Sequence, residues 1–153
     1  MISYQTTTPG ASLIEVESET PQPQGTEVLV KTVACGVCHS DIHIHEGVFE
    51  LGGGKQLEVG REGQVLGHEI FGQVVAVGPD AEGVSVGDRR VVFPWIGCGE
   101  CATCKRGEEQ LCTPGRALGI INPGGFADHV LVPHSRYLFD KGDVPDSLAA
   151  TYA

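Results

Sequence analysis

The sequence predicts a small, mainly β domain, built as a barrel or a sandwich with a few short helices. Glycine accounts for 22 of the 153 residues, which is about twice its usual share of roughly 7%. Short runs rich in Val and Ile alternate with turn signals along the chain, as in folds made of short strands. The length is that of one domain, and it is sufficient for a core without disulfides.

The N-terminal half is expected to contain strands, one short helix and a loop. Residues 11–16 and 27–34 are rich in residues that favour strands, and a Pro-rich turn separates them. Residues 38–46 contain Ser40 and Asp41, which can cap a helix, and they predict a short one. Residues 51–63 are glycine-rich and charged, which indicates a surface loop.

The C-terminal half predicts further strands around a cysteine-rich segment. Residues 65–78 have the pattern of a long or broken strand, and residues 87–95 that of a strand ended by a proline. A cysteine-rich lobe covers 98–112. Residues 125–132 and 135–139 predict the strands that close the domain.

The charge balance excludes several classes of function. The chain carries 10 Lys and Arg against 20 Asp and Glu, a net charge of −10. Nucleic-acid binding needs a basic face, and attraction to an anionic membrane needs basic charge as well. No apolar stretch approaches the roughly 18 residues of a membrane span, and the N-terminus has no secretory pattern. We therefore expect a cytoplasmic protein whose six cysteines stay reduced, which favours metal binding over disulfides.

Four cysteines have the spacing of a metal site. Cys98, Cys101, Cys104 and Cys112 follow the pattern C-x2-C-x2-C-x7-C. Four thiolates give Zn²⁺ a closed tetrahedral shell that leaves no position for substrate, so the zinc would be structural. Bacterial ferredoxins use a similar run together with a second set of cysteines, which is missing here. A structural zinc is therefore favoured over an iron–sulfur cluster and over unligated thiols.

A second, weaker set of ligands combines Cys38 with His68. One thiolate and one imidazole suit zinc, but a catalytic zinc normally has three protein ligands and an open position. Cys35 is the only other thiol outside the lobe. On a strand, a residue three positions before a ligand points to the opposite face, so a buried thiol is the preferred interpretation of Cys35.

Motifs over the whole chain combine into one familiar pattern. They are Cys38-His39-Ser40-Asp41-Ile42-His43, Gly67-His68-Glu69, the four-cysteine lobe, Val84-Ser85-Val86-Gly87-Asp88-Arg89 and Gly124-Gly125-Phe126-Ala127-Asp128-His129-Val130-Leu131-Val132-Pro133. Together they resemble the zinc-dependent medium-chain alcohol dehydrogenases, most closely their archaeal and bacterial tetrameric branch. The resemblance implies that residues 1–153 form the N-terminal catalytic domain, a partly open GroES-like β-barrel with a zinc lobe at about 95–115. It also implies a homo-oligomeric full-length protein.

The resemblance implies which residues bind zinc, and it implies that the full-length enzyme has a further ligand and a further domain. Cys38 and His68 would hold a catalytic zinc, with Glu69 close enough to approach it when substrate is absent, and the four cysteines would hold the structural zinc. The family's third catalytic ligand is a cysteine just after a helix start similar to residues 148–153, and its Rossmann cofactor domain follows. Neither is present, so we expect this chain to be the first domain of a longer enzyme, inactive by itself.

The resemblance also implies a reaction. Members oxidise a small alcohol to an aldehyde or ketone with hydride transfer to NAD or NADP, and zinc acts as the Lewis acid. Ser40 would accept the alcohol proton, and a relay through the cofactor ribose would end at His43. His39 would contact the cofactor phosphates. Three further residues would line the substrate pocket: Phe49, Trp95 and Ile120.

Three other functions are compatible with parts of the pattern. One is a non-catalytic zinc-binding GroES-like module; the cysteine lobe argues against a co-chaperone of this barrel type, because such a barrel needs no metal ligands. A zinc-ribbon nucleic-acid binder conflicts with the net charge of −10. A polyol or formaldehyde dehydrogenase of the same family stays open, as does the choice between NAD and NADP, because the residue that reads the cofactor ribose belongs to the missing domain.

Overall fold

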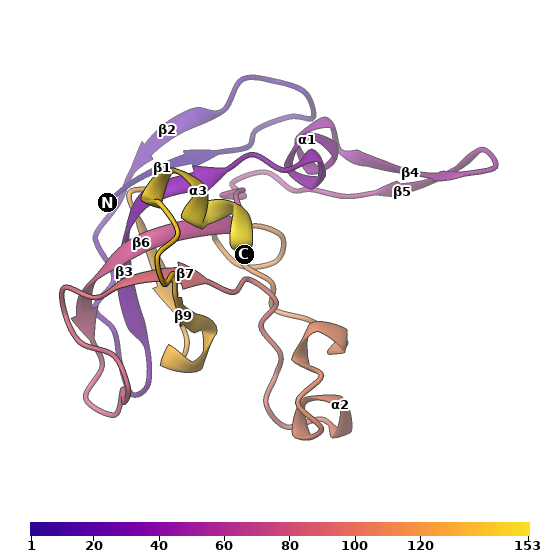
Figure 1. Ribbon diagram of the computed structural model, residues 1–153. Helices are drawn as coiled ribbons and strands as arrows, with labels where there is room; N and C mark the ends of the chain where they lie inside the picture. Colours follow the sequence, from indigo (N-terminus) through magenta and orange to yellow (C-terminus); the bar gives the residue numbers. More distant parts are fainter.

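The computed structural model describes residues 1–153. Its body is a five-stranded antiparallel sheet in the order β8-β3-β6-β7-β9; Figure 1 labels β3, β6, β7 and β9 of this sheet. Its strands are β3 (Val28–Gly36), β6 (Glu69–Val77), β7 (Arg89–Val92), β8 (His129–Val132) and β9 (Leu138–Asp140). A small sheet of β1 (Ile2–Gln5) and β2 (Ile14–Glu17) joins it through bridges between Ser3 and Ala127 and between Gln5 and Val65. The sheets curl into the partly open GroES-like barrel that the sequence predicted.

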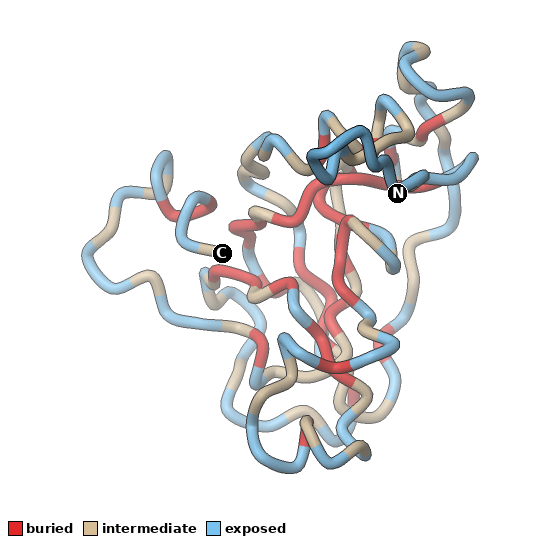
Figure 2. Tube along the Cα trace, turned by 90° about the vertical axis from the view of Figure 1, so that its right-hand side faces the viewer, coloured by how far each residue is buried: buried red, intermediate tan, exposed pale blue.

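The core lies inside the curled sheet, where alternate residues of the central strands point inward. Val28 and Val30 of β3 are fully buried together with Ile70 and Val74 of β6, whereas Lys31 is exposed. Buried residues accordingly follow the central strands in Figure 2. Each buried aliphatic side chain stabilises the fold by about 1.5–3 kcal/mol relative to an exposed one.

Short helices and 3₁₀ turns lie between the strands of the barrel and at the C-terminus. They are α1 (His39–Glu46), α2 (Ala102–Lys105) and α3 (Asp146–Ala149), with 3₁₀ turns η1 (Glu109–Leu111), η2 (Ser135–Tyr137) and η3 (Ala150–Tyr152). The C-terminal turns place Ala149 and Ala150 against Phe71 and Val91, on the face of the sheet opposite the main core. No helix has the length and apolar character needed to cross a membrane.

A hairpin occupies much of the segment that the sequence predicted to be a loop. Strands β4 (Val48–Gly52) and β5 (Lys55–Glu58) pair antiparallel and project from the body (Figure 1). Gly52, Gly53 and Gly54 have φ values of 80°, 59° and 76°, a region that glycine enters without strain. The loop prediction for 51–63 is therefore wrong over these strands, because the glycines form only the tight turn between them.

Most other elements lie close to their predicted positions. The helix over 38–46 is confirmed as α1, and the strands over 27–34 and 87–95 as β3 and β7. β1 has no counterpart among the predicted elements. The segment 135–139 begins as the turn η2 and becomes strand only from Leu138, so that prediction is half right.

Candidate metal centres

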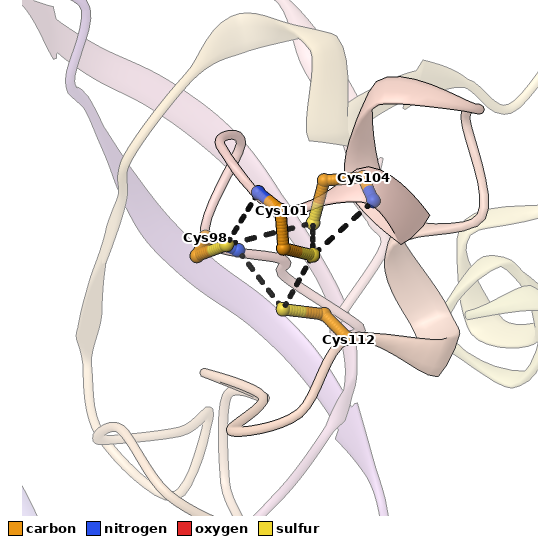
Figure 3. A group of neighbouring side chains, drawn as sticks. All are labelled: Cys98, Cys101, Cys104 and Cys112. Atoms are coloured by element: carbon orange, nitrogen blue, oxygen red, sulfur yellow. Dashed lines mark hydrogen bonds between the residues drawn. The ribbon is translucent and has the colours of Figure 1, made fainter.

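The four-cysteine lobe hangs from the barrel at α2 (Figure 1), and its sulfurs converge on one point (Figure 3). The Sγ of Cys104 lies 3.8 Å from that of Cys98 and 3.4 Å from that of Cys101, and the Sγ atoms of Cys101 and Cys112 are 3.9 Å apart. A tetrahedral zinc with bonds of about 2.3 Å requires sulfurs about 3.8 Å apart. The four sulfurs therefore fit zinc, and they are too close together to enclose a multi-iron cluster.

Local backbone geometry produces this convergence. The N–H of Cys101 donates to the Sγ of Cys98 at 3.3 Å, and the N–H of Cys104 donates to the Sγ of Cys101 at 3.4 Å. Gly99, with φ of 79°, makes the turn between the first two cysteines. Each two-residue spacing thus closes a tight turn in which backbone donors point at sulfur, an arrangement that favours thiolates.

The thiols need a cation before all four can ionise. Backbone N–H groups of Glu100 and Cys101 lower the pKa of Cys98 to about 6. At Cys112 the N–H of Cys98 acts in the same direction, but burial and the neighbouring sulfurs outweigh it and raise the pKa to about 12. A divalent, thiophilic cation removes this repulsion, and zinc is such a cation.

The second cluster forms where β3 and β6 pair. Gly36 at the end of β3 lies opposite Glu69 at the start of β6, which brings Cys38 next to His68. One ligand atom each from Cys38, His68 and Glu69 lie within 4.8 Å of one another. The structure leaves Cys35 out of this group, as the strand argument expects.

Asp41 joins the two segments that carry the ligands. Its Oδ2 accepts the N–H of Cys38 at 2.9 Å, and its Oδ1 accepts the N–H of Gly67 at 3.0 Å. The same Oδ1 lies 3.3 Å from Nδ1 of His68. A histidine ligand commonly directs its second nitrogen at such a carboxylate, so the donor set fits a metal ion.

The pKa values at this cluster follow from that contact. In the metal-free chain the Asp41 carboxylate raises the pKa of His68 to about 9, against the opposing effect of burial. Burial would raise the pKa of Asp41, but the His68 imidazole beside it and the hydrogen bonds from the Cys38 and Gly67 N–H groups outweigh it and lower the pKa. His68 is thus protonated at neutral pH without a metal, and metal binding there must release a proton.

The Glu69 carboxylate depends on the glycine opposite it. A Cβ at Gly36 would lie 2.0 Å from Oε2 of Glu69 and 2.9 Å from its Cβ. Only glycine leaves room for Glu69 to fold over β3 toward the cluster. The spacing of the sequence gives no indication of this requirement, because it becomes visible only once the two strands are paired.

Helix α1 presents the residues assigned to proton transfer. The backbone of Ser40 lowers the pKa of Cys38, and the His68 and Ser40 side chains act in the same direction against the effect of burial. His39 and His43 stack with ring centroids 4.6 Å apart, since residues four apart share a helix face. The ring of Phe49 lies 4.7 Å from that of His43.

The three residues assigned to the substrate pocket lie in two places. Trp95 and Ile120 line one cavity of about 140 Å³, which Cys112 also borders. Phe49 lies on β4 against His43 instead. Trp95 and Ile120 therefore lie on the lobe side of the barrel, and the structure does not bring Phe49 to them.

Comparison with known proteins identifies close relatives. The family described as "Alcohol dehydrogenase GroES-like domain" matches residues 24–143. An NAD-dependent alcohol dehydrogenase of Sulfurisphaera tokodaii is 47% identical over 78% of this chain and 34% of its own length. An L-threonine 3-dehydrogenase of Pyrococcus furiosus is 36% identical over 97% of this chain and 41% of its own length.

A solved structure extends the similarity to three dimensions. The cobalt- and zinc-bound thermostable alcohol dehydrogenase of Pyrobaculum aerophilum superposes with a TM-score of 0.80 at 33% identity, covering 99% of this chain and 44% of that one. The chain thus spans between a third and a half of the length of each of these relatives.

Proposed function

Because the chain belongs to the family of alcohol dehydrogenase GroES-like domains, we propose that residues 1–153 are the catalytic domain of a zinc-dependent alcohol dehydrogenase. The whole enzyme oxidises a small alcohol to an aldehyde or ketone and transfers hydride to NAD or NADP. The convergence of Cys38, His68 and Glu69, with Ser40 two residues after Cys38 in α1, carries this proposal. A non-catalytic module would not need a second cluster of ligands with a hydroxyl next to it.

Zinc occupies both centres in this proposal. The four cysteines hold a structural ion, and Cys38 and His68, with Glu69 beside them, hold the catalytic one. At the catalytic centre zinc supplies Lewis-acid chemistry, which lowers the pKa of an alcohol. Asp41 orients His68 and ties together the two segments that carry the ligands.

The proton of the alcohol leaves along α1. Ser40 lies two residues after the ligand Cys38 in α1, so it accepts this proton while passing its own hydroxyl proton through the cofactor ribose to His43. His43 lies one turn further along the helix, half-buried between His39 and Phe49. An imidazole can both accept and donate a proton, so His43 is suited to pass the proton to solvent.

The hydride acceptor requires a second domain. Residues 1–153 contain no G-x-G-x-x-G sequence, the usual phosphate-binding turn of a dinucleotide domain. We propose that this domain lies elsewhere in the enzyme, that His39 and His43 face the cofactor, and that the enzyme is a cytoplasmic homo-oligomer. Trp95, Ile120 and Phe49 are the residues proposed to contact the substrate.

The test is the activity of the full-length enzyme toward a panel of small alcohols with each cofactor. Cys38→Ser should abolish oxidation and remove the catalytic metal. Cys35→Ser is the matched control, because this thiol lies three residues away and outside the cluster, and it should retain activity. Equal activity of both variants would contradict the proposal.

A further inference from the structure

One polar cluster lies outside both metal centres and connects the lobe to the barrel. Glu109 belongs to η1, within the four-cysteine lobe, whereas Arg136 and Tyr137 belong to η2 of the barrel. The Tyr137 hydroxyl donates to Oε2 of Glu109, and Nη2 of Arg136 lies 3.1 Å from Oε1. Nη2 of Arg136 also donates to the Tyr137 hydroxyl at 2.8 Å. The three side chains therefore form a closed triangle of contacts.

The barrel side of this triangle is fixed. Tyr137 is 4% exposed and packs in the main core, and its carbonyl accepts the N–H of Phe93 at 2.8 Å. Burial and the hydrogen bond to Glu109 raise its pKa, so the hydroxyl keeps its proton and remains a donor. The Arg136 guanidinium lies 4.9 Å from the centre of the Tyr137 ring.

The lobe side of the triangle reaches the cysteine ligands. Glu109 stands between Cys104 and Cys112 in the sequence, and its Oε2 accepts the N–H of Gly97, the residue before Cys98, at 3.4 Å. A Cβ at Gly97 would lie 2.6 Å from the Sγ of Cys104 and 2.9 Å from the Cβ of Glu109. The Glu109 stem, the Gly97 backbone and the Cys104 sulfur are thus packed together.

We infer that Glu109 is the positioning residue of the four-cysteine centre, and that it holds the ligands in their converged arrangement by fixing the lobe to Tyr137 and Arg136. The inference rests on the proposed function, in which this lobe binds zinc. Ligands that are already ordered lose little conformational entropy when a metal binds. Without Glu109, the Gly97–Cys98 segment and η1 lose their shared attachment to the barrel, and zinc binding must order them again.

Release of zinc from the loaded chain to a coloured chelator tests this inference. Glu109→Ala should accelerate release by roughly 10- to 100-fold, the usual cost of losing a residue that orients metal ligands. Glu109→Gln keeps an acceptor oxygen for Tyr137 and Gly97, so it should restore most of the retention. Tyr137→Phe removes only the hydroxyl and keeps the ring, so it should accelerate zinc release without leaving a cavity in the core.

Glu108→Ala is the matched control. Glu108 is the adjacent acidic residue, but it pairs only with Arg106 of the same lobe, so its removal should leave the release rate at that of the unmodified chain. Cobalt substitution adds a spectroscopic measurement, because the thiolate-to-cobalt absorption reports the ligand geometry, and Glu109→Ala should alter it.

Two results would overturn the inference, and they are distinguishable. If the unmodified chain holds no zinc or cobalt on its cysteines, the zinc assignment fails and the inference fails with it. If the unmodified chain holds the metal, and both Glu109→Ala and Tyr137→Phe lower the melting temperature while release and cobalt absorption stay unchanged, the triangle is only a structural contact and the inference alone is wrong.

Discussion

Single residues show how the barrel separates reactive groups from inert ones within a few positions. Cys35 and Cys38 are three residues apart, yet Cys38 joins a ligand cluster while Cys35 packs beside Gly67 and Gly125. Their pKa values diverge accordingly: hydrogen bonding by Ser40 lowers that of Cys38, and burial raises that of Cys35 to about 12. The environment, rather than the residue type, decides which thiol is available.

This divergence predicts selective alkylation. The thiolate is the reactive form, and a pKa of about 12 leaves Cys35 almost entirely protonated at pH 8. In the metal-free chain iodoacetamide should modify Cys38 at pH 8, whereas Cys35 should react appreciably only when the pH approaches 12 or the chain unfolds. Peptide mass mapping after timed quenching measures both sites, and equal modification of the two thiols at pH 8 would contradict the burial argument.

The proposed proton path predicts that substitutions of Ser40 and His43 in α1 have unequal effects on the rate. In the full-length enzyme Ser40→Ala should lower the rate of alcohol oxidation by ~10²–10⁴-fold, the range of a general acid–base group in contact with the reacting atom. His43→Gln should cost less, because water can partly replace a more distant exit. The ratio of kcat/KM values over a pH series measures both, and a Ser40→Ala enzyme with unchanged rates would remove Ser40 from the mechanism.

At the scale of elements, the sequence predicts strands best where apolar residues alternate. β3 and the helix α1 lie close to their predicted ranges, but the N-cap of α1 is Cys38, and Asp41 accepts the Cys38 N–H from inside the helix. The hairpin β4–β5 could not be predicted in this way, because its strands are exposed and have no buried face to produce alternation. The Gly52–Gly54 run contributes to the loop prediction for 51–63, because the turn of a hairpin and a surface loop have the same composition.

The metal centres also differ in how far a local sequence pattern predicts them. The C-x2-C-x2-C spacing predicts its own cluster, because each step closes a local turn onto sulfur. The contacts of Glu109 with Tyr137 and of Gly36 with Glu69 join residues far apart in the chain. Such contacts depend on strand register and on how the lobe sits against the barrel, so a single sequence does not indicate them.

The two centres predict different metal retention. Four thiolates close a tetrahedron, whereas Cys38 and His68 offer only one thiolate and one imidazole, with a carboxylate nearby. After zinc loading and dialysis, residues 1–153 should retain one zinc per chain, and the second centre should be empty or partly filled. Metal analysis and native mass spectrometry count the ions.

Two variants locate the retained ion. Cys98→Ser should lower zinc retention and destabilise the lobe, because a structural zinc contributes folding energy directly. Cys38→Ser should leave the retained zinc unchanged. If Cys38→Ser removed the retained ion, or if the chain stayed folded with no zinc at all, the assignment of the tight site to the lobe would be wrong.

At the scale of the whole molecule, the net charge and the separation of the substrate site from the cofactor site bear on the proposed function. The net charge of −10 disfavours polyanionic partners such as nucleic acid. Residues 1–153 contain two candidate metal centres but no G-x-G-x-x-G turn. The chain spans 34% and 41% of the length of its two curated dehydrogenase relatives. Alcohol oxidation needs both a substrate site and a cofactor site, so its rate in residues 1–153 tests whether the proposed enzyme requires a second domain.

We expect residues 1–153, loaded with zinc, to show no measurable alcohol oxidation with either NAD or NADP. The Lewis acid and Ser40 act only on the substrate side, so a cofactor in free solution must meet the substrate by chance. Holding two reactants in attack geometry lowers a barrier by about 7–11 kcal/mol, and that contribution is lost. Absorbance of the reduced cofactor at millimolar substrate measures the rate, and the full-length enzyme under the same conditions is the positive control. Turnover by the 153-residue chain at a rate typical of enzymes would show that the hydride acceptor has a site within these residues, and it would contradict the proposed division between the two domains.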